Sequence, residues 1–221
     1  IRLLRELGVE KARAYAERFG FEKSRLPADL SLALGTASLS PLKNATAFSV
    51  FANGGKKINS YFINRIINRT GEIIFEREDL QPTQVIDERV AFIIKDILQE
   101  AGRRGTAKKI IELERPDFSG KTGTTNEAES TWFTGFNDSL VTTVWVGFDQ
   151  PKSLGNREFG SSIALPIWLD FIKNNLEEIT LNISIPPRGI VAVKIDKTTG
   201  KRVGDDSNNS IFEYYLEENT P

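Results

Sequence analysis

Three stretches typical of β-strands follow one another so closely that they constrain the fold more than any other feature of this chain. They cover residues 118–125, 130–136 and 140–148, and Asn137 and Asp138 supply a turn between the last two. A parallel pair needs a crossover connection of about a dozen residues or more, and the gaps here are far shorter. The sequence therefore predicts an antiparallel sheet.

Apolar residues recur at helical spacing on both sides of this sheet. The pattern predicts helices over residues 1–7, 10–19, 41–52, 88–101 and 163–176. Ser40 and Asp87 stand where N-caps are expected, and Pro41 suits the first helical turn. A short hairpin is predicted over residues 61–76.

Two of these helices have a predicted core face. The fourth is expected to end at Gly102 and to pack through Val90, Ile93, Ile94, Ile97 and Ala101. The last is expected to pack on the sheet through Ile167, Trp168, Phe171 and Ile172.

These elements predict an α+β fold, an antiparallel sheet flanked by helices. The C-terminal stretch differs, because Pro186 and Pro187 mark a linker and a small β appendage that wraps back follows it. We expect a main domain over residues 1–179, and a linker with a β tail over residues 180–221.

The chain contains no cysteine and no histidine. A thiolate nucleophile, a disulfide framework, a Ser-His-Asp triad and the usual zinc sites are therefore excluded within it. Any acyl transfer has to use lysine, carboxylate or hydroxyl groups, and no cofactor is expected. With 29 basic and 30 acidic residues the net charge is -1, so nothing favours nucleic acid as a partner. No apolar run is long enough for a membrane segment.

The sharpest motif is Ser-Gly-Lys-Thr-Gly-Thr-Thr over residues 119–125, on the first predicted strand. Gly120 and Gly123 leave room for another backbone to approach an edge strand, and Lys121 offers a fixed positive charge. The neighbouring threonines supply hydroxyl donors. Such an edge suits an extended peptide that ends in a carboxylate. The alternative is a surface hairpin strand with a solvated lysine.

Other polar and aromatic groups favour a structural interpretation. A solvated helix end is favoured over a substrate contact for Arg103, Arg104, Lys108 and Lys109. A core position is favoured over a cleft for Trp132, Phe133, Trp145 and Phe148. No general base can be assigned among Asp117, Glu127 and Glu129, which flank the motif.

The motif strand resembles one of three motifs, Ser-x-x-Lys, Ser-x-Asn and Lys-Thr-Gly, that serine acyl-transferases of the penicillin-binding family combine. Further stretches are similar to class A, bifunctional penicillin-binding proteins, most closely of the 1A type. They are residues 1–21, 32–38, 51–55, 105–107, 120–126, 131–136, 144–149 and 212–215. The resemblance covers nearly the whole chain and indicates the C-terminal part of the transpeptidase domain.

The resemblance implies the transpeptidase fold that is shared with serine β-lactamases, here incomplete. It also implies a peptidoglycan D,D-transpeptidase, in which a serine attacks a D-Ala-D-Ala stem peptide, releases D-alanine and passes the acyl group to an amine. Lys121 would stabilise charge during proton transfer. Thr122 and Thr124 would bind the carboxylate of substrate or β-lactam, and the Thr124 backbone N–H would form half of the oxyanion hole. Gly123 and Thr125 would complete the substrate-binding strand.

The nucleophile is expected outside this sequence, because in the family both serine motifs precede the helix near Ile1. Ser40–Lys43 matches Ser-x-x-Lys by letter, but a serine followed by proline is typical of a helix cap. Ser207–Asn209 matches Ser-x-Asn by letter, but it lies in a polar loop after Lys121. We therefore expect this chain alone to be inactive.

Two alternatives stay open at this point. One is a non-catalytic peptidoglycan-binding or scaffolding module of the same fold. The other is a β-lactamase or D,D-carboxypeptidase, which shares Lys-Thr-Gly but is disfavoured by the 1A-type stretches before and after Lys121. The resemblance implies stem peptides and β-lactams as partners, along with the missing N-terminal half of the protein. It also implies the periplasmic face of the bacterial inner membrane, with the membrane anchor and a glycosyltransferase domain outside this chain.

Overall fold

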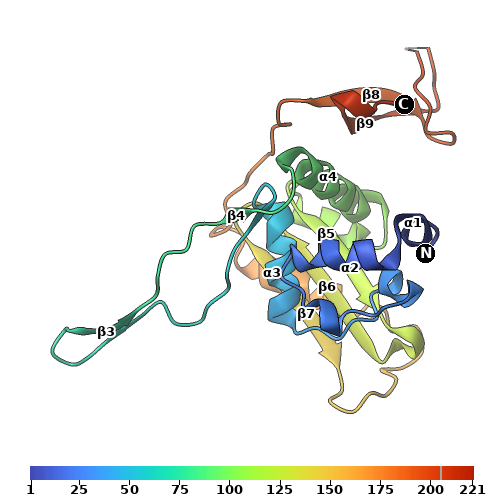
Figure 1. Ribbon diagram of the computed structural model, residues 1–221. Coiled ribbons are helices and arrows are strands. Elements are labelled where there is room, and N and C mark those ends of the chain that lie inside the picture. Colours follow the sequence, from blue (N-terminus) through green and yellow to red (C-terminus); the bar gives the residue numbers. More distant parts are fainter. Residues whose placement is uncertain (205) are drawn as a thin grey trace.

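The computed structural model describes residues 1–204 and 206–221 (Figure 1). Its α-helices are α1 (Arg2–Leu7), α2 (Val9–Glu17), α3 (Pro41–Ala52), α4 (Glu88–Arg104) and α5 (Ala164–Asn174). Its strands are β1 (Lys56–Lys57), β2 (Arg65–Ile67), β3 (Ile73–Glu76), β4 (Thr83–Gln84), β5 (Ser119–Thr124), β6 (Ser130–Phe136), β7 (Val141–Gly147), β8 (Ile190–Asp196) and β9 (Ser210–Leu216). Short 3-10 helices are η1 (Lys23–Arg25), η2 (Leu30–Leu34), η3 (Lys108–Leu113), η4 (Asn126–Ala128) and η5 (Glu217–Asn219). Helices around small antiparallel sheets confirm the predicted α+β class.

The central sheet consists of β5, β6 and β7 in that order, paired antiparallel throughout. Each strand lies within a residue of the predicted stretch at either end. The register places Lys121 opposite Thr134, and Thr122 opposite Phe133. Because side chains alternate along a strand, Lys121 and Thr134 share one face of the sheet while Thr122 and Phe133 share the other.

Helix α5 covers the face that carries Phe133. Trp168 of α5 is fully buried, and its ring centroid lies 5.1 Å from that of Phe133. Gly135 makes this contact possible, since a Cβ there would lie 2.3 Å from Cζ2 of Trp168. The predicted packing of Trp168 and Ile172 is confirmed. The same prediction is wrong for Ile167 and Phe171, which are exposed. These two residues are four positions apart and therefore lie on one face of the helix, and that face is turned to solvent.

Helix α3 covers the opposite face. Ser40 caps it as predicted, since its Oγ accepts the N–H of Lys43 at 3.2 Å. One turn later, Nδ2 of Asn44 donates to Oγ1 of Thr134 at 2.8 Å. This helix therefore reaches the sheet at the residue that pairs with Lys121.

Helix α4 is capped by Asp87, as predicted, but it departs from the prediction in two respects. It continues past Gly102 to Arg104. Gly102 does not end the helix but packs against the side chain of Ile110, which a Cβ at this position would approach to 3.2 Å. Ile97 is 52% exposed although it was expected in the core. The buried face instead includes Lys95, whose charge is matched by Asp138.

Two hairpins extend from this body (Figure 1). The β2–β3 hairpin was predicted; it projects as an arm, with every residue of both strands exposed. The β8–β9 hairpin lies beside α4, where Phe92 and Tyr214 stack edge to face at 5.1 Å and Arg89 pairs with Glu218 at 2.9 Å. This hairpin confirms the small β appendage, while the domain division at residue 179 stays a prediction. In the part of the chain that the structure describes, no helix is long and apolar enough to cross a membrane.

Candidate active site

The predicted active-site strand, β5, is an edge strand of the central sheet. The N–H of Thr125 donates to the carbonyl of the opposite residue, Ser130, at 3.1 Å. Because hydrogen-bonded and non-hydrogen-bonded pairs alternate in an antiparallel ladder, the backbones of Gly123 and Lys121 also face β6. The N–H and C=O groups of Thr122 and Thr124 therefore point away from β6, toward the open edge.

The two halves of β5 differ in exposure. Ser119 and Gly120 are buried, and Oγ of Ser119 donates to the Lys95 carbonyl in α4 at 3.0 Å. Lys121 and Thr124 are exposed, while Thr122 is half-buried. Helix α4 thus covers the first half of the strand and leaves the motif half accessible.

The charged group of the motif lies at this edge. Nζ of Lys121 donates to the carbonyl oxygen of Thr122 at 2.6 Å, so the ammonium group bends toward the backbone groups that face outward. A cation in this position can stabilise a negative charge that develops beside the strand.

The threonine hydroxyls are held by residues outside the strand. Oγ1 of Thr122 lies 2.8 Å from Oγ1 of Thr106, which follows α4. Oγ1 of Thr124 accepts the backbone N–H of Gly160 at 3.0 Å. Sequence reasoning gave no role to Thr106 or Gly160. The predicted substrate-binding residue Thr125 uses its hydroxyl differently, to accept the N–H of Ser130 at 2.8 Å in the turn.

The motif glycines are explained by packing within the fold. A Cβ on Gly120 would lie 2.6 Å from Cζ of Phe133, and one on Gly123 would lie 3.1 Å from Cβ of Trp132. The expectation that Gly120 leaves room for a ligand backbone is therefore wrong, because a core aromatic ring fills that space.

The aromatic residues near the motif divide between core and surface. Phe133 is fully buried, as predicted, but Trp145 and Phe148 are 37% and 44% exposed. Trp132 pairs with Trp145 on the face that α3 covers, yet α3 contacts the sheet at Thr134 and beyond. The core prediction is therefore wrong for Trp145 and Phe148, whose side chains are partly exposed to solvent.

Asp117 has a structural environment. It is 2% exposed, and Arg115 holds both its carboxylate oxygens, with Nε and Nη2 each donating at 2.8 Å. Asn137 adds a hydrogen bond at 2.9 Å. Burial alone would raise the pKa of Asp117, but the bonds from Arg115 and Asn137 outweigh it and hold the pKa below its ordinary value. The ion pair with Arg115 thus favours the anionic form of Asp117.

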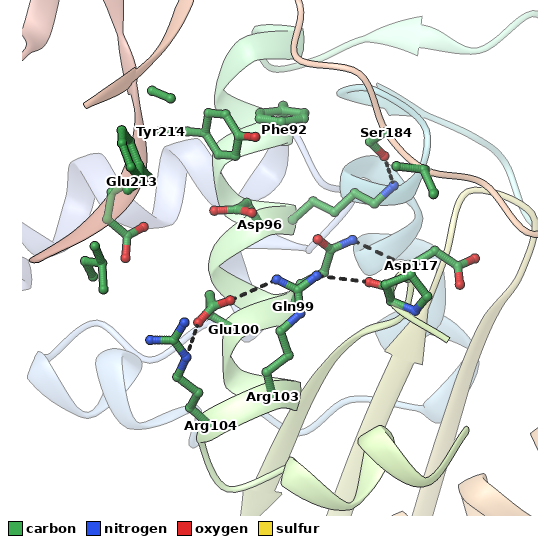
Figure 2. A pocket seen from close by; sticks show the side chains of 16 residues that line it. Phe92, Asp96, Gln99, Glu100, Arg103, Arg104, Asp117, Ser184, Glu213 and Tyr214 are labelled. Carbon is green, nitrogen blue, oxygen red and sulfur yellow. Dashed lines mark hydrogen bonds and ion pairs between the residues drawn. The ribbon is translucent and has the colours of Figure 1, made fainter. Parts of the chain in front are cut away.

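A cavity of about 390 Å³ lies elsewhere, between α4 and β9, and the motif residues do not line it (Figure 2). Asp96 and Glu213 face it, together with Phe92 and Tyr214. Burial raises the pKa of Asp96, and the neighbouring carboxylates of Glu213 and Glu100 raise it further. The basic residues Arg103 and Arg104 also line the cavity and pair with Glu100, which confirms a helix end on the surface.

The serines that match motifs by letter have local roles. The cap that Ser40 forms on α3 engages its hydroxyl. Ser207 lies between β8 and β9, where its carbonyl accepts the hydroxyl of Ser210 at 2.7 Å. In the described residues, groups of three or more acidic side chains that could hold a metal ion are also absent.

Comparison with known proteins gives consistent matches. The family model of the penicillin binding protein transpeptidase domain matches residues 1–173. Penicillin-binding protein 1A of Pseudomonas aeruginosa is 37% identical over an alignment of 270 residues, which covers 100% of this chain and 33% of that protein. The chain thus spans about a third of the length of this relative.

Solved structures agree with this assignment. The crystal structure of penicillin-binding protein 1A from Haemophilus influenzae superposes with a TM-score of 0.88 at 32% identity, covering 100% of this chain and 38% of that one. The PonA1 protein of Mycobacterium tuberculosis in complex with penicillin V gives a TM-score of 0.67 at 23% identity, covering 83% and 55%. At that identity the second match supports the fold alone.

Proposed function

This chain belongs to the penicillin-binding protein transpeptidase family and resembles its 1A-type members over its whole length, and from this membership we propose that it carries the Lys-Thr-Gly half of a peptidoglycan D,D-transpeptidase. Cross-linking of stem peptides would be the activity of the full-length protein. In this proposal the nucleophilic serine and the Ser-x-Asn motif come from the preceding part of that protein, so the chain alone is inactive.

The observation that carries the proposal is the open edge of β5. The outward N–H and C=O groups of Thr122 and Thr124 can pair with an extended stem peptide as an added strand would. The Thr124 N–H would also donate to the oxyanion that forms when the serine attacks, with the serine's own N–H as the second donor. The hydroxyls of these two threonines would bind the terminal carboxylate.

The reaction that this edge would support is an acyl transfer in two steps. The serine oxygen bonds to the carbonyl carbon of the penultimate D-alanine, the peptide C–N bond breaks, and the departing D-alanine nitrogen takes the proton that the serine loses. An amine of a second stem peptide then attacks the ester carbon, the C–O bond to the serine breaks, a new amide forms, and the proton that the amine loses goes to the serine oxygen. Lys121 would stabilise the charged states of both proton transfers.

Partners and location follow from family membership as part of the same proposal. The substrate class is a stem peptide that ends in D-Ala-D-Ala, and β-lactams would acylate the same serine through their ring carbonyl. PonA1, which has been solved with penicillin V, shares the fold. The protein would act at the periplasmic face of the bacterial inner membrane.

The test is labelling of the full-length protein with a fluorescent penicillin, comparing wild type with Lys121→Ala. We expect strong labelling that the substitution reduces at least tenfold, or about 1.4 kcal/mol of transition-state stabilisation. No labelling of a folded wild-type protein would instead support a non-catalytic module of the same fold. Unchanged labelling in Lys121→Ala would mean that β5 is not the active-site strand.

A further inference from the structure

Both hydroxyls of the motif strand are held by residues that are distant in the sequence. The Oγ1 atoms of Thr106 and Thr122 lie 2.8 Å apart. The backbone N–H of Gly160 donates to Oγ1 of Thr124 at 3.0 Å. We propose that Thr106 and Gly160 are positioning residues that aim the two hydroxyls at the substrate carboxylate, an inference that rests on the proposed function above.

The Gly160 contact fixes what the Thr124 hydroxyl can do. A hydroxyl has one proton to donate and two lone pairs that accept. A backbone N–H can only donate, so its bond to Thr124 occupies one lone pair and leaves the hydroxyl proton for another acceptor. An ionised carboxylate is such an acceptor and has no proton of its own to give. The contact therefore prepares Thr124 as a donor toward an anionic ligand.

The Thr106 contact supplies the same preparation for Thr122. Either hydroxyl of the pair can donate to the other. When a carboxylate is bound, the favoured arrangement has Thr106 donating to Thr122 and Thr122 donating to the ligand. Hydrogen bonds arranged in such a chain polarise and strengthen one another. Thr106 thereby acts through Thr122 without touching the substrate.

The residue type at position 160 is dictated by space. Gly160 is buried, and a Cβ there would lie 2.5 Å from the carbonyl oxygen of Trp132 and 2.7 Å from that of Gly123. Both are backbone atoms of paired strands, which cannot move aside without disturbing the sheet. The backbone φ of Gly160 lies outside the left-handed region, so close approach is what requires glycine. Any side chain would push the loop, and its N–H, away from Thr124.

The experiment measures acylation rates of the full-length protein by two probes, benzylpenicillin and its methyl ester, which lacks the charged carboxylate. The positioning variants are Gly160→Ala and Thr106→Val, and Thr106→Ser keeps the hydroxyl. Matched controls are Gly204→Ala, at a glycine with nothing within 4 Å of the added Cβ, and Thr83→Val, at an exposed strand position.

We expect Gly160→Ala and Thr106→Val to slow acylation by benzylpenicillin about tenfold, with little change for the ester. Thr106→Ser and both controls should retain the wild-type ratio between the probes. An equal loss of acylation rate with both probes would overturn the inference, because it would show general disruption of the site. An unchanged acylation rate in Gly160→Ala and Thr106→Val would overturn it as well. If neither probe acylated the wild-type protein, the proposed function itself would be refuted, and this inference with it.

Discussion

The central sheet and the β8–β9 hairpin are both antiparallel, yet they are stabilised in different ways. The sheet is covered on both faces, by α5 through the fully buried Trp168 and by α3 through Asn44. The hairpin meets α4 through an aromatic pair and an ion pair at the surface, and Phe212 on β9 is 68% exposed. Isolated two-stranded hairpins are marginally stable, so the hairpin depends on α4 while the sheet has its own core.

This difference bears on function because the candidate active site lies on the sheet. Groups that receive a developing charge must be held in place by rigid surroundings. The outward backbone of Thr124 belongs to a strand whose neighbour, β6, is buried at Phe133 and Thr134. The hairpin offers no comparable support, and the cavity beside it is separate from the motif.

The largest expected effect on stability comes from truncating Trp168, the largest fully buried side chain packed on the sheet. Trp168→Ala should lower the free energy of unfolding by about 3–5 kcal/mol, the usual cost of truncating a buried tryptophan. Native-state hydrogen exchange in the full-length protein would locate the loss in β5, β6 and β7. Penicillin labelling should fall with it, since β5 loses its support.

The matched change in the hairpin is Tyr214→Ala, which removes the ring that stacks on Phe92. Its cost should be about 1–2 kcal/mol, from the aromatic pair and the partial burial of the ring, and the faster exchange should be confined to β8, β9 and the adjoining side of α4. If Tyr214→Ala loosened the sheet as much as Trp168→Ala does, the two regions would be one cooperative unit and the comparison would fail.

How far the sequence predicted this arrangement depended on the range of the interactions involved. The strands, the caps at Ser40 and Asp87 and the motif around Lys121 were found because their signals are local. The error at Ile97 has a long-range cause. Helix α4 buries the face that carries Lys95, whose charge is paired with Asp138, a residue distant in the sequence. The positions of Thr106 and Gly160 beside the motif threonines follow from packing between distant loops, which no local pattern encodes.

The next prediction concerns the free energy of unfolding that is contributed where the main body meets the segment leading to the hairpin. Asp117 and Arg115 form a buried pair, and Arg115 also donates to the carbonyl of Thr180, where the chain leaves the main body. Asp117→Asn should cost about 2–3 kcal/mol, because it removes hydrogen bonds to a charged group and leaves the guanidinium without its counter-ion. The measurement is the free energy of unfolding as a function of pH.

The sign of that pH dependence is fixed by the lowered pKa of Asp117. A carboxyl whose pKa is lower in the folded state contributes stability that is fully present above its unfolded value, near 3.8, and lost as pH falls through the folded value. The substitution should remove this acid-side loss. The control is Glu112→Gln, which breaks an exposed pair with Lys173 and should change stability little. Equal effects of the two substitutions would contradict a structural role for the Asp117 pair.

The smallest effect concerns Asp96, in the cavity between α4 and the hairpin (Figure 2). Its pKa is raised by burial and by Glu213, so the folded state binds a proton more tightly than the unfolded chain. Stability from this group therefore increases as pH falls through the folded pKa and levels off below the unfolded value, the reverse of Asp117. Asp96→Asn should abolish this rise and stabilise the protein near neutral pH by a few tenths of a kcal/mol, since solvent screens a half-exposed group.

The expected gain from Asp96→Asn should appear as slower hydrogen exchange in β9 and the facing turns of α4, with the sheet unaffected. Asp170→Asn, an exposed position on α5, is the matched control and should change neither region. A loss of stability in Asp96→Asn would mean that the carboxylate is needed as an anion. The hairpin would then be attached by an ionic contact in that cavity, and its attachment would resemble the Asp117 junction instead of contrasting with it.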